Sequence, residues 1–383
     1  MRLVFFLLVL LTSFAQARPA LELVESFPTE TEFDQTDIRD TQEVWLELLN
    51  EAESEILWHT FYLAHDEGKA TEPIVDALKA AAERGVRVHL LVDRKFLKVY
   101  PDTLNTLDGL ENIEVRTSPV GGWLGGVMHA KMILVDGAVG FLGSQNFDWR
   151  SLEHIRELGI VFRDPRLVEI YGKVFRWEWE NHQSSVVPQN LPKVQSKTFE
   201  VGGARVRPTV SPVGLNDQAG LDDESRILEL LDQATESIDI ALLSYAPTDH
   251  SGRIHYPDLD NSIRRAALRG VKVRLLVSHW SEEKAEVDDL LSLDVLDNVE
   301  VRACRVATAE VGDIPFARVH HSKYLVVDSA QAWLGTSNWS RGYFHDSRNY
   351  GLIVLSGPIP ERLDRLYEFD WEHSTPLDDR REN

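Results

Sequence analysis

Cysteine is nearly absent from this sequence, which has one, Cys304, in 383 residues. A single cysteine excludes an intramolecular disulfide. Because no cluster of Cys or His surrounds it, we expect a buried, small apolar side chain. The sequence also lacks the His-Glu-x-x-His and Cys-x-x-Cys patterns that hold zinc, so we expect neither a catalytic metal nor a cofactor. Beyond the N-terminus it has no apolar run long enough to cross a bilayer.

Positive charge is also scarce. Lys and Arg number 40 against 62 Asp and Glu, so the formal net charge is −22. This charge argues against broad electrostatic binding to nucleic acid or to anionic lipid. It leaves room for a local basic groove, because a few Lys and Arg are enough to line one cleft. The length fits two domains or one duplicated fold.

The N-terminal segment predicts a signal peptide over residues 1–17. Arg2 supplies a positive charge, residues 3–14 are apolar, and Ala15 and Ala17 flank Gln16 in the small-x-small pattern of a cleavage site. An uncleaved anchor helix is the alternative, although the apolar stretch is short for a membrane span. We therefore expect the mature chain to be exported, to the periplasm or out of the cell.

The chain repeats itself over almost its whole length. Strands are expected at 88–92 and 273–277, and each follows a helical pattern that ends at Arg-Gly-Val, with Gly at the usual C-cap position. Further matches join 53–62 with 236–245, 158–161 with 350–353, and 175–178 with 369–372. This duplication predicts an α/β fold with two similar sandwich halves packed as a pseudo-dimer.

The boundaries of the halves follow from composition. The N-terminal half is predicted at 18–185 and the C-terminal half at 211–383, each with one copy of the motif described next. Residues 186–210, which include several Pro and Gly, are predicted as the linker. Because one chain supplies both halves, we expect a monomer with no obligate protein partner.

One constellation of polar residues appears once in each half, at identical spacing. In the first half, His129 and Lys131 precede an apolar strand that ends at Asp136, and Ser144 and Asn146 follow the next strand. The second half repeats them as His321, Lys323, Asp328, Thr336 and Asn338. Residues two apart in a strand share a face, so each His and its Lys point the same way. On a buried strand such a pair needs partners or a cleft.

Two His, two Lys and two Asn around one cavity suit the cleavage of a phosphodiester. The lysines and amides can hold non-bridging oxygens and stabilise the charge of a pentavalent transition state. One His can attack phosphorus and form a covalent phosphohistidine, and the other can protonate the leaving oxygen and then deprotonate water. A lone His-x-Lys is usually part of a surface strand. Two copies at identical spacing in a duplicated chain favour the functional interpretation.

These motifs resemble the paired HKD motifs of the phospholipase D superfamily, over essentially the whole mature chain. The resemblance is closer to the endolysosomal phospholipase D-like proteins of animals and their poxvirus relatives, through 142–152, 157–159 and 334–340. It implies the phospholipase D fold and cleavage or transfer through a phosphohistidine. The animal branch implies 5′-exonuclease action on single-stranded nucleic acid or lysophospholipid transphosphatidylation. By this resemblance the catalytic positions are His129, Lys131, Asn146, His321, Lys323 and Asn338.

Glu157 distinguishes the two halves. It follows His129 at the separation at which Asn349 follows His321. In related enzymes a Glu at this place orients the nucleophilic His through its second ring nitrogen, and a carboxylate there stabilises an imidazolium. We therefore predict His129 as the nucleophile and His321 as the general acid. The alternative for Glu157 is a solvated surface carboxylate.

The remaining motif residues are expected to support the site. Asp136 and Asp328 lie on the opposite parity from His and Lys, so they are expected to hold a turn or backbone groups. Ser144 and Thr336 either hydrogen-bond phosphate or end their strands.

Three further features are weaker candidates. His59 lies on a strand beside the site and is expected to be a satisfied core histidine, with pocket lining as the alternative. His320 points to the opposite face from His321. Residues 121–126 predict a mobile aromatic loop, which would serve as a lid, a stacking platform, a lipid-insertion tip or a simple connector.

Function is left between three hypotheses. We predict the first, a phospholipase D-type hydrolase acting on phospholipid head groups with peripheral membrane contact, because export favours it. The branch resemblance favours a nuclease acting on single-stranded ends, for which the acidic chain would need a clustered basic groove. A catalytically inactive binding protein is the third, and two complete motifs argue against it.

Overall fold

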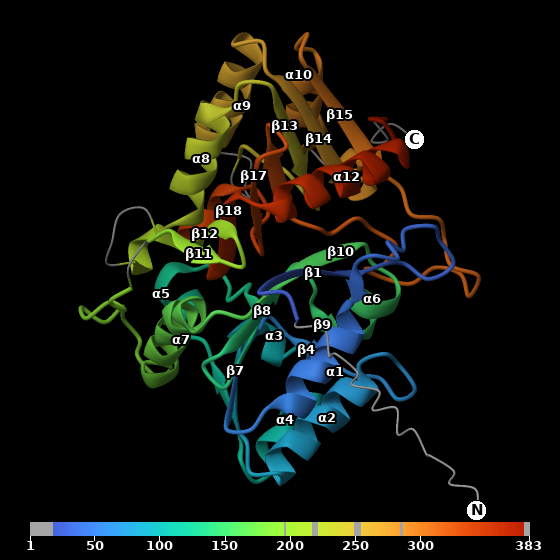
Figure 1. Ribbon diagram of the computed structural model, residues 1–383. Coiled ribbons are helices and arrows are strands. Elements are labelled where there is room, and N and C mark those ends of the chain that lie inside the picture. The colour runs from blue at the N-terminus through green and yellow to red at the C-terminus, as the bar shows by residue number, and fades with distance from the viewer. Residues whose placement is uncertain (1–17, 195–196, 217–220, 249–253, 284–285, 379–383) are drawn as a thin grey trace, which may run out of the picture.

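Two β-sheets, each covered by helices, form the chain in a computed structural model that describes residues 18–194, 197–216, 221–248, 254–283 and 286–378 (Figure 1). The predicted signal peptide lies outside the described residues. Among the described residues, no helix combines the length and apolar character needed to cross a membrane.

The first sheet has the strand order β2-β1-β10-β8-β7-β3-β5-β6. Its strands are β1 (Leu21–Ser26), β2 (Arg39–Asp40), β3 (Glu55–Thr60), β5 (Arg87–Val92), β6 (Ile113–Thr117), β7 (Lys131–Val135), β8 (Val139–Gly143) and β10 (Glu157–Phe162). Two short strands, β4 (Leu63–Ala64) and β9 (Phe147–Asp148), pair separately. Its helices are α1 (Thr41–Glu51), α2 (Glu72–Glu83), α3 (Arg94–Leu97), α4 (Asp102–Asp108), α5 (Val120–Leu124), α6 (Trp149–Glu153) and α7 (Pro165–Glu180).

The second sheet has the order β11-β12-β18-β17-β16-β13-β14-β15-β19. Its strands are β11 (Phe199–Val201), β12 (Ala204–Ser211), β13 (Ser237–Ala241), β14 (Lys272–Ser278), β15 (Val299–Cys304), β16 (Tyr324–Val327), β17 (Gln331–Gly335), β18 (Asn349–Ser356) and β19 (Ser374–Pro376). Its helices are η1 (Val213–Leu215), α8 (Asp223–Gln233), α9 (Asp258–Leu268), η2 (His279–Glu282), α10 (Glu286–Asp294), α11 (Arg341–His345) and α12 (Pro358–Glu372).

The internal repeat is visible in this topology. The order β1-β10-β8-β7-β3-β5-β6 matches β12-β18-β17-β16-β13-β14-β15, with the same parallel and antiparallel pairings at each step. Strands β11 and β12 belong to the second sheet although they begin inside the predicted linker, 186–210. We therefore propose that the C-terminal half begins at Phe199, because β12 pairs with β18 as β1 pairs with β10.

Three large apolar clusters hold these layers together. One joins α1 and α2 to the outer face of the first sheet, and another joins α8 and α9 to the outer face of the second. The third contains Leu167 and Val174 of α7, Leu363 and Tyr367 of α12, and strand residues from both sheets. This shared central cluster packs the halves against each other, with the sheets one above the other in Figure 1. Cys304 is buried in it, as predicted.

Helices α7 and α12 each form a buried ion pair with an arginine of the opposite half. The Arg348 guanidinium bonds the Glu178 carboxylate of α7, and Nε of Arg156 lies 3.2 Å from Oδ1 of Asp370 of α12. Glu178 therefore corresponds to Asp370. The match of 175–178 with 369–372 made from sequence is wrong by two residues, since Phe and Trp recur along both helices.

Candidate active site

Each motif His and its Lys lie on the same side of their chain segment, as the strand period predicts. Nζ of Lys131, the first residue of β7, donates a 2.8 Å hydrogen bond to the backbone oxygen of His129. Nζ of Lys323 makes the same bond to the oxygen of His321. The two histidines are about a tenth exposed or less, and both lysines are buried. The two motifs therefore have the same local geometry.

Each motif histidine is held by the opposite half of the molecule. Nδ1 of His129 lies 3.1 Å from Oδ1 of Asn349, at the start of β18. Nδ1 of His321 lies 2.7 Å from Oε2 of Glu157, at the start of β10. The side chains that orient the imidazoles are thus exchanged between the halves.

Backbone hydrogen bonds fix the same exchange. The amide of His129 donates to the oxygen of Arg348 at 2.9 Å, and the amide of His321 donates to the oxygen of Arg156 at 2.8 Å. Both arginines are buried and carry the ion pairs of α7 and α12 described above. The interface between the halves therefore positions both imidazoles directly.

The sequence-based assignment of Glu157 to His129 is wrong. Glu157 is buried and bonds His321, and its other oxygen accepts a 2.7 Å hydrogen bond from the hydroxyl of Ser151. The alternative of a solvated carboxylate is wrong as well. Position along the chain could not reveal this, because β10 begins at the interface and its first side chain projects toward the other half.

The pKa values of the two motif histidines depend on the two motif lysines. Burial, and then the positive charges of Lys131 and Lys323, hold the pKa of His129 well below its usual range. Burial lowers the pKa of His321 to about 4, against the raising effect of Glu157, with Lys131 and Lys323 lowering it further. Each lysine therefore lies near enough to both imidazoles to lower their pKa.

The lysines are short of counter-charge. Burial and then Lys323 hold the pKa of Lys131 well below its usual range, with Glu157 and Asp93 opposing. Burial lowers the pKa of Lys323 to about 7, and Glu157 opposes this. The pKa of Glu157 is lowered despite its burial, because His321 and Lys323 stabilise its anion. An entering phosphodiester anion would restore the charged state of both lysines.

The hydroxyls of the motifs support the orienting side chains. Thr336 donates to Oδ1 of Asn349 at 2.8 Å, and Nδ2 of Asn349 donates to the backbone oxygen of Tyr343 at 2.8 Å. Ser144 accepts from the amide of Leu158 at 3.0 Å and helps to lower the pKa of Glu157. Two roles were left open for Ser144 and Thr336, hydrogen bonding to phosphate and ending a strand. The contacts that they make here are structural.

The two asparagines retain hydrogen-bonding capacity. Asn146 and Asn338 follow β8 and β17, and the amide oxygen of each is buried without a hydrogen-bond partner among the described residues. A buried amide with an unused atom is costly unless a ligand meets it. Each amide oxygen is therefore free to accept a hydrogen bond from a ligand that offers a donor.

Asp136 and Asp328 hold backbone, as predicted. Asp136 accepts from the amides of Glu53, Ser54 and Glu55, and Asp328 accepts from those of Thr235, Glu236 and Ser237. Both residues have positive φ, 53° and 50°. They fix the tight turn after β7 and β16.

The weaker candidates are accounted for by packing. Nδ1 of His59 lies 3.0 Å from the hydroxyl of Tyr350, and its ring is fully buried, so it is a core histidine. Nε2 of His320 lies 3.3 Å from Asp370, on the side away from Glu157. Residues 120–124 form α5, and Trp123 donates to the oxygen of Ser184 at 3.0 Å. This aromatic side chain is anchored, which disagrees with a mobile loop.

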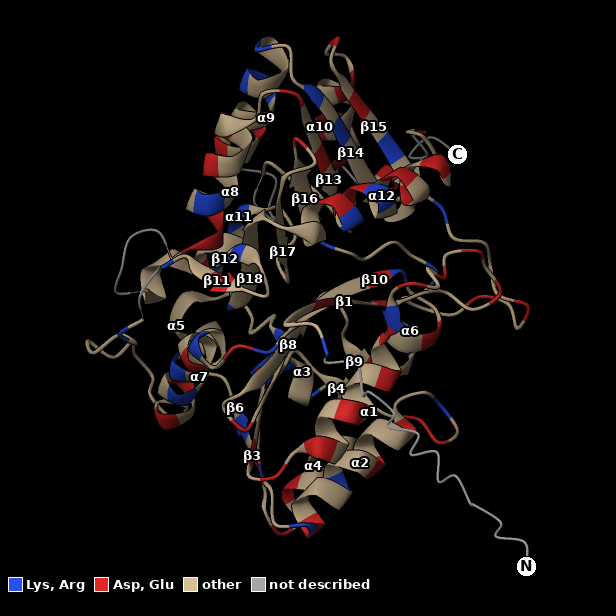
Figure 2. Cartoon of the chain, in the orientation of Figure 1, with Lys and Arg blue, Asp and Glu red and all other residues tan. Residues whose placement is uncertain are grey.

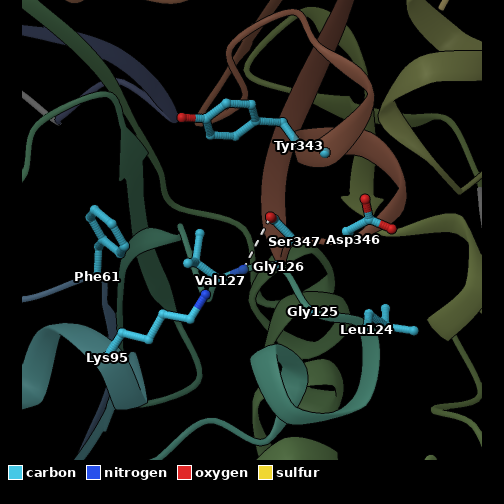
Figure 3. Close-up of a pocket in the computed structure, with 10 residues that line it drawn as sticks. Phe61, Lys95, Leu124, Gly125, Gly126, Val127, Tyr343, Asp346 and Ser347 are labelled. Carbon is cyan, nitrogen blue, oxygen red and sulfur yellow. Dashed lines mark hydrogen bonds between the residues drawn. The ribbon is translucent and has the colours of Figure 1, made fainter. Parts of the chain in front are cut away.

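A cavity of about 420 Å³ lies between Phe61, Lys95 and residues 124–127 of the first half and Tyr343, Asp346 and Ser347 of the second half (Figure 3). Phe61 and Tyr343 line it from opposite halves, and each ring centroid lies 4.9 Å from that of His129. Lys95 reaches into it from α3, and residues 124–127 form the adjoining wall. The sequence patterns did not predict a place at the site for Phe61, Tyr343, Lys95 or Ser151. The sequence offered one signal for Phe61, which directly follows a core strand and lies two residues after His59.

Comparisons with known proteins agree with this geometry. The family described as "Cardiolipin synthase, PLD-like domain" matches residues 45–179 and again 227–371. The chain is 28% identical to "Phospholipase D Z" of Dictyostelium discoideum, over 92% of this chain and 89% of that protein. It is 33% identical to "5'-3' exonuclease PLD3" of Rattus norvegicus, over 91% of this chain and 78% of that protein.

Solved structures share the fold. The crystal structure of phosphatidylserine synthase from Haemophilus influenzae Rd KW20 superposes with a TM-score of 0.63 at 14% identity, covering 88% of this chain and 85% of that one. The predicted two-half α/β fold is therefore confirmed. Among the described residues, no group of three or more His, Cys, Asp or Glu is arranged to hold a metal ion.

Proposed function

Because the chain belongs to the phospholipase D superfamily, we propose that this phosphodiesterase works through a covalent phosphohistidine on His321, with His129 as the general acid and base. The observation that carries the proposal is the 2.7 Å contact between Nδ1 of His321 and Glu157. The proposal reverses the roles expected from sequence, because the carboxylate supports the other imidazole.

The first step follows from the protonation that the contacts impose. Glu157 is ionised and can only accept, so Nδ1 of His321 carries the hydrogen and Nε2 has the free electron pair. Nε2 attacks phosphorus and the bond from phosphorus to the leaving oxygen breaks. His129, in the imidazolium form that the bound phosphate anion favours, gives its Nε2 proton to that oxygen. The carboxylate stabilises the cationic phosphohistidine that results.

The neutral amide of Asn349 suits His129 to acid catalysis. Its Nδ2 donates to Tyr343 and its Oδ1 accepts from Thr336, so Oδ1 faces His129 and Nδ1 is the donor. An amide oxygen stabilises an imidazolium less than a carboxylate does, so Nε2 of His129 releases its proton more readily. In the second step, His129 takes a proton from water, the oxygen of which displaces His321 from phosphorus.

Two substrate classes are candidates. Phospholipid head groups are supported by export and by similarity to proteins named phospholipase D and phosphatidylserine synthase. Single-stranded nucleic acid is supported by similarity to proteins named 5'-3' exonuclease, and by the aromatic and cationic wall that Phe61 and Lys95 give the cavity. We favour nucleic acid on this second observation. Export through residues 1–17 to the periplasm or the medium, and action as a monomer, stay part of the proposal.

The test is activity of the purified mature chain in EDTA. Bis(p-nitrophenyl) phosphate, phosphatidylglycerol vesicles and a 5′-hydroxyl oligodeoxythymidylate are offered separately. We expect release of p-nitrophenol and of nucleotides. Turnover of lipid without nucleotide release would assign the lipid function instead, and no cleavage of any of the three would contradict the proposed function.

A further inference from the structure

Helix α3 carries three cations beside the cavity. Arg94, Lys95 and Lys98 are all exposed, and none forms an ion pair among the residues that the structure describes. Several exposed cations elsewhere face a carboxylate, as Arg176 faces Glu55 at 2.6 Å. Acidic residues cover the outer helices α1, α4 and α12 (Figure 2). An unpaired cationic helix is therefore exceptional on this acidic surface.

This helix is fixed to the catalytic segment. Oδ1 of Asp93 accepts from the amide of Lys95 at 2.8 Å and caps α3. Oδ2 of the same carboxylate accepts from the amide of Met128, next to His129, at 2.8 Å. Asp93 is 3% exposed, so this connection is buried. The cations of α3 thus hold a set position relative to the first motif.

A series of aromatic rings runs from α3 to the catalytic imidazole. Tyr100 stacks on Tyr62 at 4.8 Å between centroids, and Tyr62 stacks on Phe96 at 5.6 Å. Phe96 lies 3.9 Å from Phe61, which lies 4.9 Å from His129. Each ring but the outermost has neighbours on both sides. The series is a packed wall whose ends are Tyr100 at the outside and Phe61 in the cavity.

In the part of the second half that the structure describes, the equivalent place has no such group of cations. After β14, the strand that corresponds to β5, the chain forms η2, where Ser278 takes the capping role of Asp93. Residues 279–283 carry two glutamates and no Lys or Arg, and Glu282 pairs with Arg305. Both halves contribute an aromatic ring to the cavity, but among the described residues the unpaired cations of this region lie in the first half, which gives the cleft a direction.

We propose that α3 and this aromatic wall form a second binding site, outside the catalytic cavity, for the nucleotides next to the scissile phosphate of a single-stranded nucleic acid. This rests on the proposed function and adds the path of the strand. Phosphates beyond the reacting one meet Arg94 and Lys98, and Tyr100 offers an outer ring face to a base. A phospholipid with a single phosphate, such as phosphatidylglycerol, has no further phosphate or base to use these groups.

The experiment compares strand lengths. The ratio of kcat/KM for a dodecamer of deoxythymidylate to that for the dinucleotide is measured for the wild type, for Arg94→Gln/Lys98→Gln and for Tyr100→Leu. The matched control is Lys79→Gln/Lys173→Gln, which removes the same charge from cations paired with Asp76 and Glu169. Melting temperatures check that all variants fold.

We expect Arg94→Gln/Lys98→Gln to lower the length advantage about 10-fold, and to reduce the slope of log kcat/KM against log salt by about 1 per cation removed. Tyr100→Leu should lower the advantage without changing the salt slope, and the control should match the wild type. Wild-type length dependence in the α3 variant, or an equal loss in the control, would overturn the second site. Both outcomes leave phosphodiester cleavage intact, whereas failure to cleave even bis(p-nitrophenyl) phosphate would refute the proposed function itself.

Discussion

The carboxylate of Glu157 accepts a 2.7 Å hydrogen bond from Nδ1 of His321, a residue 164 positions further along the chain and in the other half of the molecule. The matching contact, between His129 and Asn349, replaces this carboxylate with an amide. A duplicated fold would otherwise give two equivalent histidines. This one difference makes the site chemically asymmetric, and the assignment of roles depends on it.

Replacement of each histidine by alanine should block a different step of the reaction. p-Nitrophenolate leaves without a proton, so His129→Ala should still release one equivalent from bis(p-nitrophenyl) phosphate and then stall, because no base activates water. His321→Ala should release none. Rapid-quench measurement of the burst, with mass spectrometry of the phosphorylated peptide, tests this. A phosphopeptide containing His129 would reverse the assignment.

Removal of the carboxylate should be costly. Glu157→Gln keeps the shape of the side chain but loses the charge that stabilises the cationic phosphohistidine, so kcat should fall about 100-fold or more. Asn349→Ala should lower the rate of leaving-group expulsion more for an alcohol than for p-nitrophenol. Steady-state kinetics with both substrates measure this. An equal response of the two variants to leaving-group pKa would argue against separate roles.

The pH dependence of kcat/KM should be bell-shaped and acidic. His321 must be neutral to attack, and its pKa is lowered to about 4 by burial, so activity rises as pH increases through about 4. Lys323 must be charged to hold phosphate, and burial lowers its pKa to about 7, so activity falls as pH increases through about 7. With bis(p-nitrophenyl) phosphate, whose leaving group takes no proton from His129, the alkaline fall should disappear in Lys323→Arg, since guanidinium stays charged. If the alkaline fall in kcat/KM persisted in this variant, it would have to arise from a group other than Lys323.

The buried ion pair at the interface should matter for stability. Arg348→Leu leaves Glu178 buried without its cation, and we expect a loss of about 3–5 kcal/mol in the free energy of unfolding. Arg348→Leu/Glu178→Leu should lose less, because no uncompensated charge remains. Lys79→Ala, in an exposed pair with Asp76, should cost less than about 1 kcal/mol. Urea unfolding measures all three, and a single variant no worse than the double would contradict the account.

Local patterns predicted the parts of the site that depend on neighbours in sequence. The strand period gave the shared side of His129 and Lys131, and a strand-ending aspartate gave the turn at Asp136. Contacts between halves were beyond such patterns. Glu157 follows His129 by the same number of residues as Asn349 follows His321. This spacing does not reveal whether the partner of each histidine lies in its own half or in the other half. The aromatic repeat in α7 and α12 similarly fitted more than one alignment of the halves.

The exchanged contacts also govern when the chain becomes reactive. As the ribosome completes β10, His129 has been made but Asn349 has not, and Glu157 has no imidazole to orient. An unfinished chain therefore carries an entire first motif without a working centre. Until β18 is synthesised and docked, His129 lacks its amide partner, and until His321 is made, Glu157 lacks its imidazole.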